Sequence, residues 1–139
     1  MSIGLSVQPG MATILLVEDN DDVREMMAVA LELGGHTVWT AANGRDALAR
    51  LRQGVRPCLI LLDLMMPVMN GWELRAALKA DATLADIPVI VVSAVTAEIA
   101  NRLNGAEYVP KPVDIDQLLD IVCEYCDGDS DAVAPRSRN

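Results

Sequence analysis

The chain has 139 residues, of which 52% are hydrophobic and only 3% aromatic, with no phenylalanine. This composition supports one folded domain with an aliphatic, methionine-rich core, and it excludes global disorder. Eleven Lys and Arg residues against 20 Asp and Glu residues give a formal net charge of −9, which argues against direct nucleic-acid binding because that function needs a basic face.

The sequence carries no sign of export or membrane insertion. No apolar run approaches the ~18 residues that a membrane span requires, and the start MSIGLSVQPGM has no basic segment before a long apolar one. We therefore expect a cytoplasmic protein without a membrane partner, and three cysteines, an odd number, also favour a reducing compartment. Cys123 and Cys126 form a C-x-x-C pair that closes a predicted helix instead of opening one, which argues against redox or metal use.

Strand-like and helix-like segments alternate along the chain. In chain order, the expected elements are a strand at 13–17, a helix at 21–33, a strand at 36–40, a helix at 45–53, a strand at 58–62, a helix at 72–80, a strand at 89–92, a short helical stretch at about 96–104, a strand at 107–110 and a helix at 114–124. We expect the domain to cover 12–126, between a flexible extension at 1–11 and a disordered tail at 127–139.

The first helix, 21–33, has an apolar face at helical spacing, and Asp21 or Asp22 can cap its start. His36 begins an edge strand and is expected to be exposed, whereas Trp72 anchors the third helix. The residues expected to face the core are Val23, Met26, Met27, Ala30 and Leu31 in the first helix and Ile115, Leu118, Leu119 and Val122 in the last.

The strands at 13–17, 58–62 and 89–92 are wholly apolar, which is typical of parallel strands that are covered on both faces. Five alternating β-α units therefore predict a doubly wound, five-stranded parallel α/β domain with helices on both faces. Domains of this class place their functional sites at the carboxyl ends of the strands.

Polar residues follow four of these five strand ends. Because the carboxyl ends of parallel strands meet at one edge of the sheet, these side chains are expected to converge there, whereas strand 36–40 contributes nothing reactive. The converging residues are Glu18 and Asp19 after the first strand, Asp63 after the third, Ser93 after the fourth and Lys111 after the fifth.

The three carboxylates predict a divalent cation. Two like charges ~4 Å apart at an effective dielectric of ~20 repel by about 4 kcal/mol, so three clustered carboxylates do not all stay ionised unaided. Mg²⁺ is typically held by one or two carboxylates and waters, and it neutralises charge in phosphoryl transfer. Lys111 adds a positive charge for a phosphate and Ser93 a hydroxyl donor. No competing nucleophile is evident, so Asp63 is the expected covalent phosphoryl acceptor.

Four segments, LLVEDND, LLDLMMPVMNGWEL, VIVVSA and YVPKPV, resemble the receiver domain of two-component response regulators, of the stand-alone, single-domain type. The 30-residue interval from Asp63 to Ser93 matches that family. The resemblance implies a flavodoxin-like sheet of order 2-1-3-4-5. It also implies a phosphorelay switch in which Asp63 accepts phosphoryl from a phosphohistidine on a sensor histidine kinase or a histidine phosphotransfer protein.

The resemblance also implies which residues bind the metal. Asp19 would bind Mg²⁺ directly, with Glu18 acting nearby or through water. Asp63 and the backbone carbonyl of Met65 would complete the protein ligands.

The remaining roles concern the phosphoryl group and the switch. The resemblance implies that Ser93 and Lys111 bind the phosphoryl group, that the Lys111–Pro112 bond is cis, and that Tyr108 is the switch aromatic. We expect Ser93 to move inward on phosphorylation and to vacate space into which Tyr108 turns. Beyond its own phosphorylation and dephosphorylation, the protein is not expected to be an enzyme.

The sequence departs from the family between Ser93 and Lys111, which are only 18 positions apart, about one helical turn fewer than usual. The fourth helix, at about 96–104, is therefore expected to be shortened. No DNA-binding or enzymatic module is expected after residue 126. The expected output is a contact with an unknown downstream protein, or onward phosphotransfer, by a monomer or a weak phosphorylation-dependent dimer without direct DNA binding.

Other functions fit the sequence less well. A nucleotide- or flavin-binding module needs a Gly-rich first turn, but VEDNDD is acidic. A phosphohydrolase with an Asp nucleophile usually has a second acid where Met65 lies. The main alternative is a pseudo-receiver that is never phosphorylated and acts as a constitutive scaffold, but the loss of an acid or lysine that would mark one is not seen. Taken singly, Asp63 is also compatible with a cap and Tyr108 with plain packing.

Overall fold

The computed structural model describes residues 13–64, 66, 68–94 and 107–126. In this part of the chain, five parallel strands form one sheet in the order β3-β2-β4-β5-β6. Counted along the chain, this is the order 2-1-3-4-5, so the predicted topology is confirmed. The strands are β2 (Thr13–Val17), β3 (Thr37–Ala41), β4 (Leu59–Leu62), β5 (Val89–Ser93) and β6 (Glu107–Pro110).

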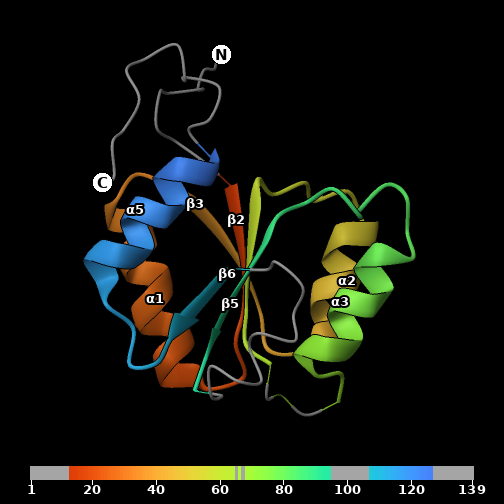
Figure 1. Cartoon of the computed structure of the whole chain (residues 1–139), viewed down its shortest axis with the longest axis horizontal. Coiled ribbons are helices and arrows are strands. Elements are labelled where there is room, and N and C mark those ends of the chain that lie inside the picture. The colour runs from red at the N-terminus through yellow and green to blue at the C-terminus, as the bar shows by residue number, and fades with distance from the viewer. Residues whose placement is uncertain (1–12, 65, 67, 95–106, 127–139) are drawn as a thin grey trace.

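Helices cover both faces of this sheet, which makes the predicted doubly wound α/β arrangement (Figure 1). In β2, Ile14 and Leu16 pack toward one pair of helices, whereas Leu15 and Val17 pack toward the other. This alternation gives the sheet two separate cores, which explains why its central strands are apolar throughout. The helices are α1 (Asp21–Leu33) and α5 (Ile115–Cys126) on the first face, and α2 (Gly44–Arg52) and α3 (Gly71–Lys79) on the second.

The boundaries of these elements lie within one residue of the prediction, except that α5 extends two residues further, to Cys126. The cap of α1 also differs from the prediction. Its N-cap is Asn20, whose Oδ1 accepts a hydrogen bond from the backbone N–H of Val23 at 2.9 Å. Asp21 and Asp22 instead occupy the first turn, where negative charge favours the helix dipole. The predicted segments 1–11, 96–104 and 127–139 lie outside the described residues.

Two expectations about exposure were wrong. His36 is only 5% exposed, because its backbone N–H donates to the carbonyl of Leu31 at 3.2 Å and ties it to the end of α1. Gly35, at φ +96°, makes the turn that permits this contact. Met26 is 49% exposed, because α1 turns Met27 and Leu31 toward the sheet and leaves Met26 on its outer side.

The cysteines are not all thiols. A disulfide joins Cys58 to Cys126 across 68 positions, with a Cα–Cα distance of 5.4 Å, and Cys123 is the one described cysteine outside it. The odd number of cysteines, which favoured a reducing compartment, did not indicate this bond. The pairing arises because α5 runs back along the sheet, so its last residue meets the residue that precedes β4.

Candidate functional site

Backbone hydrogen bonds continue the sheet beyond its strands and align the residues that follow them. The N–H of Asp63 donates to the carbonyl of Val17 at 3.1 Å, and that of Glu18 donates to Ala41 at 3.0 Å. The N–H of Lys111 likewise donates to the carbonyl of Ser93 at 3.1 Å. The predicted site residues are thus fixed side by side at the carboxyl edge of the sheet, as the parallel topology requires.

The side chains of these residues meet in one network. Ser93 Oγ donates to Asp63 Oδ1 at 3.2 Å, and Lys111 Nζ lies 2.8 Å from Glu18 Oε1 and 3.4 Å from Asp63 Oδ2. Glu18 is 2% exposed, Asp63 5% and Ser93 not at all. Asp63 therefore lies between a hydroxyl donor and an ammonium group. These two contacts offset the free-energy cost of burying its carboxylate.

The electrostatics of this network follow from burial and pairing. Burial raises the pKa of Glu18, against the opposing effect of its hydrogen bonds from Lys111 and from the backbone N–H of Asn20. The nearby charge of Asp63 raises the pKa of Glu18 further. Burial acts to lower the pKa of Lys111, but its contacts with Glu18 and Asp63 outweigh burial and leave that pKa raised. Lys111 therefore stays charged, whereas the pKa of Glu18 remains raised by its burial.

The donor set fits a hard divalent cation. Glu18, Asp19 and Asp63 each offer a carboxylate oxygen, and these atoms lie within 4.8 Å of one another. Oxygen-only ligands are those that Mg²⁺ prefers, and Asp19 is exposed, so the cluster is open to solvent on that side. The backbone carbonyl of Met65, predicted as a further ligand, lies outside the described residues.

The loop after Asp63 is held by a glycine. A Cβ on Gly71 would lie 2.6 Å from the carbonyl oxygen of Asp63 and 2.7 Å from Leu64 Cα, closer than real side chains approach. The N–H of Gly71 donates to the carbonyl of Leu64 at 3.0 Å, and Asn70 forms a capping box with Glu73 at the start of α3. Gly71 thus lets α3 begin directly against the backbone of Asp63, a contact that the Asn-Gly pair alone did not predict.

Tyr108 is connected to the site through the backbone. Its hydroxyl donates to the carbonyl of Ser93 at 3.3 Å, and its half-buried ring packs against the small core cluster of Leu64 and Val91, against which Trp72 also packs. The prediction that Trp72 anchors the start of α3 agrees with this packing. The Lys111–Pro112 bond is cis, as predicted.

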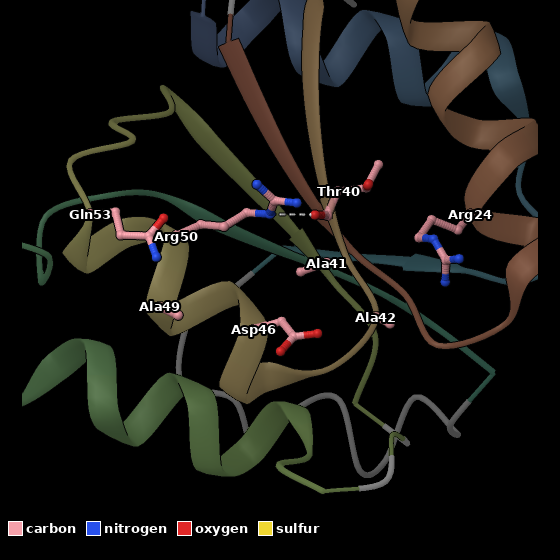
Figure 2. Close-up of a pocket in the computed structure, with 8 residues that line it drawn as sticks. All are labelled: Arg24, Thr40, Ala41, Ala42, Asp46, Ala49, Arg50 and Gln53. Atoms are coloured by element: carbon pink, nitrogen blue, oxygen red, sulfur yellow. Dashed lines mark hydrogen bonds between the residues drawn. The ribbon is translucent and has the colours of Figure 1, made fainter.

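Arg24 was not predicted as part of the site. Its Nη1 donates to the backbone carbonyl of Glu18 at 3.0 Å, and its Nη2 pairs with Asp21 at 2.6 Å. A surface pocket of about 440 Å³ lies next to Arg24. Figure 2 shows this pocket between α1, the end of β3 and α2. Arg50, on the α2 side, donates from Nε to the carbonyl of Thr40 at 2.7 Å and lies 5.5 Å from the ring of Trp39. The pocket holds none of the predicted site residues.

The fold and the cluster of Glu18, Asp19 and Asp63 at the carboxyl edge of the sheet are typical of one class of signalling protein. Comparison with known proteins identifies the same class. Residues 14–123 match the model of the response regulator receiver domain, so the chain belongs to that family. It is similar to the protein PilH of Pseudomonas aeruginosa, with 37% identity over 113 residues that cover 78% of this chain and 93% of PilH.

Two further relatives extend the comparison. Identity to the phosphate regulon transcriptional regulatory protein PhoB of Pseudomonas aeruginosa is 40% over 112 residues, which cover 77% of this chain but only 48% of PhoB. The chain therefore corresponds to about half of that regulator. The chemotaxis response regulator CheY4 of Vibrio cholerae matches with a TM-score of 0.73 and 31% identity, covering 83% of this chain and 98% of CheY4. Within the described residues, every helix is too short or too polar to cross a bilayer.

Proposed function

We propose that the protein is the phosphoacceptor switch of a two-component phosphorelay and that Asp63 is the residue that is phosphorylated. The observation that carries this proposal is the placement of the Asp63 carboxylate, 3.2 Å from the Ser93 hydroxyl and 3.4 Å from the Lys111 ammonium, beside two further acids. One carboxylate with a cation and a hydroxyl donor at hand is suited to form and hold an acyl phosphate.

In the proposed reaction, a carboxylate oxygen of Asp63 attacks the phosphorus of a phosphohistidine on a sensor histidine kinase or a histidine phosphotransfer protein. An O–P bond forms, the P–N bond breaks, and the imidazole keeps the electron pair. Mg²⁺ held by Glu18, Asp19 and Asp63 would neutralise charge on the phosphoryl oxygens. Beyond this transfer and the hydrolysis of its own acyl phosphate, the protein would catalyse no other reaction.

Lys111 and Ser93 then act on the new phosphoryl group. Lys111 Nζ already reaches the Asp63 carboxylate and can follow the added negative charge, and Ser93 can donate to a phosphoryl oxygen instead of to Asp63 Oδ1. Hydrogen bonds to charged groups contribute roughly 1.5–3 kcal/mol each. Two such bonds are enough to shift a two-state equilibrium by two or more powers of ten.

The proposed output is a changed protein-binding surface. The Tyr108 hydroxyl is held by the carbonyl of Ser93, so a movement of Ser93 toward the phosphoryl group changes the position that the ring prefers. The proposed partners are a phosphohistidine donor and a downstream protein, in the cytoplasm, without direct DNA binding. The protein would act as a monomer or a weak phosphorylation-dependent dimer.

The test is intact-protein mass spectrometry after incubation with acetyl phosphate and Mg²⁺, together with a beryllofluoride titration. The wild-type chain is expected to gain one phosphoryl group, and Asp63→Asn is expected to gain none. Chelation of Mg²⁺ is expected to abolish the adduct. Failure of both the adduct and beryllofluoride binding would overturn the proposal and favour a constitutive scaffold.

A further inference from the structure

A covalent bond fastens the end of α5 to the sheet. Cys126, the last residue of α5, is bonded to Cys58, which directly precedes β4. Both cysteines are only half-buried and pack at the margin of the core that α1 and α5 share. Because both residues lie at the edge of that core and neither is fully buried, a thiolate on the same helix can approach this bond more readily than a bond sealed inside a core.

This bond lies far from the acidic site. Cys58 precedes the amino end of β4, whereas Asp63 follows its carboxyl end, and a strand rises about 3.3 Å per residue, so the two are roughly 16 Å apart. In Figure 1 the last turn of α5 lies at the opposite end of the sheet from the tips of β5 and β6. We therefore expect chemistry at the disulfide to leave the contacts of Asp63 unchanged.

The third cysteine lies on the same helix as one partner of the bond. Cys123 precedes Cys126 by three residues, is half-buried and is not disulfide-bonded. Residues three apart on a helix are neighbours, with Cβ atoms about 5–6 Å apart, and a disulfide needs about 3.5–4.5 Å. The shortfall is small, and it falls in the last turn of the helix, where the backbone adjusts most easily.

We propose that Cys58, Cys123 and Cys126 form a thiol–disulfide exchange site. In this site the Cys123 thiol exchanges with the Cys58–Cys126 disulfide, which joins the end of α5 to the start of β4. The Cys123 thiolate attacks the sulfur of Cys126, so that a Cys123–Cys126 disulfide forms, the Cys58–Cys126 bond breaks, and Cys58 leaves as the thiolate. The thiol proton that Cys123 loses to solvent is regained by Cys58, so this step needs no external oxidant or reductant. A dithiol reductant completes the opening by giving two electrons to the remaining disulfide and becoming a cyclic disulfide itself.

This exchange would replace the disulfide that links α5 to the start of β4 by a disulfide within α5. The middle of the helix stays packed, because Leu118, Ile121 and Val122 are buried in the core independently of the cysteines. Only the last turn is released from β4. The surface formed by the end of α5 would thus respond to the thiol–disulfide balance, while the opposite edge of the sheet responds to phosphoryl transfer.

The test uses the full chain purified without reductant and held at about pH 8.5, where roughly half of an ordinary thiol is ionised. Iodoacetamide then traps free thiols, and peptide mass spectrometry maps the bonds. The wild-type chain is expected to yield two isomers: Cys58–Cys126 with Cys123 alkylated, and Cys123–Cys126 with Cys58 alkylated. The matched variant Cys123→Ser is expected to yield the first bond alone.

A second measurement follows the release of the helix end. With dithiothreitol, amide hydrogen exchange in the last turn of α5 is expected to rise more than exchange in β2, while beryllofluoride binding at Asp63 is unchanged. A wild-type chain in which Cys58 is never alkylated would show a permanent structural bond and overturn the proposal. Equal alkylation of Cys58 in Cys123→Ser, or unchanged exchange in α5 after reduction, would also overturn it. The alkylation and hydrogen-exchange outcomes do not depend on whether Asp63 is phosphorylated, so their failure is distinguishable from failure of the proposed function.

Discussion

Lys111 Nζ lies 2.8 Å from Glu18 Oε1, although 93 positions separate the two residues in the chain. This ion pair closes the acidic site on the β6 side and keeps the Lys111 ammonium group beside Asp63. Glu18 is 2% exposed and the Lys111 side chain 21%, so removal of the lysine would leave a buried carboxylate without this ammonium partner.

Replacement of Lys111 by Met is expected to destabilise the protein by about 2 kcal/mol at neutral pH, because a buried carboxylate loses its partner. Burial already raises the pKa of Glu18 above 4.5, and loss of the Lys111 hydrogen bond raises it further. A carboxyl group with a raised pKa favours the folded state only while it is protonated. The loss of unfolding free energy in Lys111→Met is therefore expected to be small below pH 4.5, where Glu18 is protonated. It is expected to grow as the pH rises through the raised pKa of Glu18.

Urea unfolding of wild type and Lys111→Met across this pH range measures the effect. Lys79→Met, at an exposed position at the end of α3, is the matched control and is expected to show no such trend. A deficit that is independent of pH would show that the charge of Glu18 is not what the lysine stabilises.

Replacement of Gly71 by Ala tests whether the loop carrying Asp63 is set by the start of α3. The new Cβ would meet the carbonyl oxygen of Asp63 at 2.6 Å, so the backbone must shift, at a cost of about 2 kcal/mol. Because the shift is at Asp63 itself, beryllofluoride affinity is also expected to fall. Gly35→Ala, where φ is +96° but no atom lies within 4 Å, is the control. It is expected to lose about 1 kcal/mol of stability with unchanged affinity.

Much of this architecture is predictable from local patterns, because parallel strands buried on both faces must be apolar and their carboxyl ends must meet. Glu18, Asp63, Ser93 and Lys111 could be assigned to one edge for that reason. Features that depend on the exact path between elements were not predictable. The burial of His36 follows from the path of the chain at the end of α1, where its backbone N–H donates to the carbonyl of Leu31.

The disulfide shows the same limit over a longer range. Cys58 and Cys126 are 68 positions apart, and their pairing depends on where α5 ends relative to the amino end of β4. No local pattern around either cysteine indicates that relationship. The C-x-x-C spacing of Cys123 and Cys126 instead suggests that those two belong together. Arg24 was missed for a related reason, since its partner at Glu18 is a backbone carbonyl and leaves no trace in side-chain spacing.

Replacement of Ser93 by Ala removes the hydroxyl that donates to Asp63 Oδ1 at 3.2 Å. Stability is expected to fall by only about 1 kcal/mol, because Asp63 keeps its contact with Lys111. The rate of phosphorylation by acetyl phosphate is expected to fall roughly ten- to hundredfold, the equivalent of one hydrogen bond to a charged group. Thr83→Ala, which removes an exposed hydroxyl bonded to Asp81, is the control and should leave the rate unchanged. A wild-type rate in Ser93→Ala would exclude Ser93 from the transfer.

Replacement of Tyr108 by Phe separates ring packing from the hydrogen bond to Ser93. The ring keeps its packing against Leu64 and Val91, but the hydrogen bond to the Ser93 carbonyl at 3.3 Å is lost. If activation requires that bond to break, its absence favours the active arrangement. Beryllofluoride is then expected to bind up to roughly fivefold more tightly, corresponding to about 1 kcal/mol. Tyr125→Phe, on the last turn of α5, is the matched control. Tighter binding in Tyr108→Phe alone would place the tyrosine hydroxyl on the inactive side of the switch, and unchanged binding would show that the hydroxyl does not restrain it.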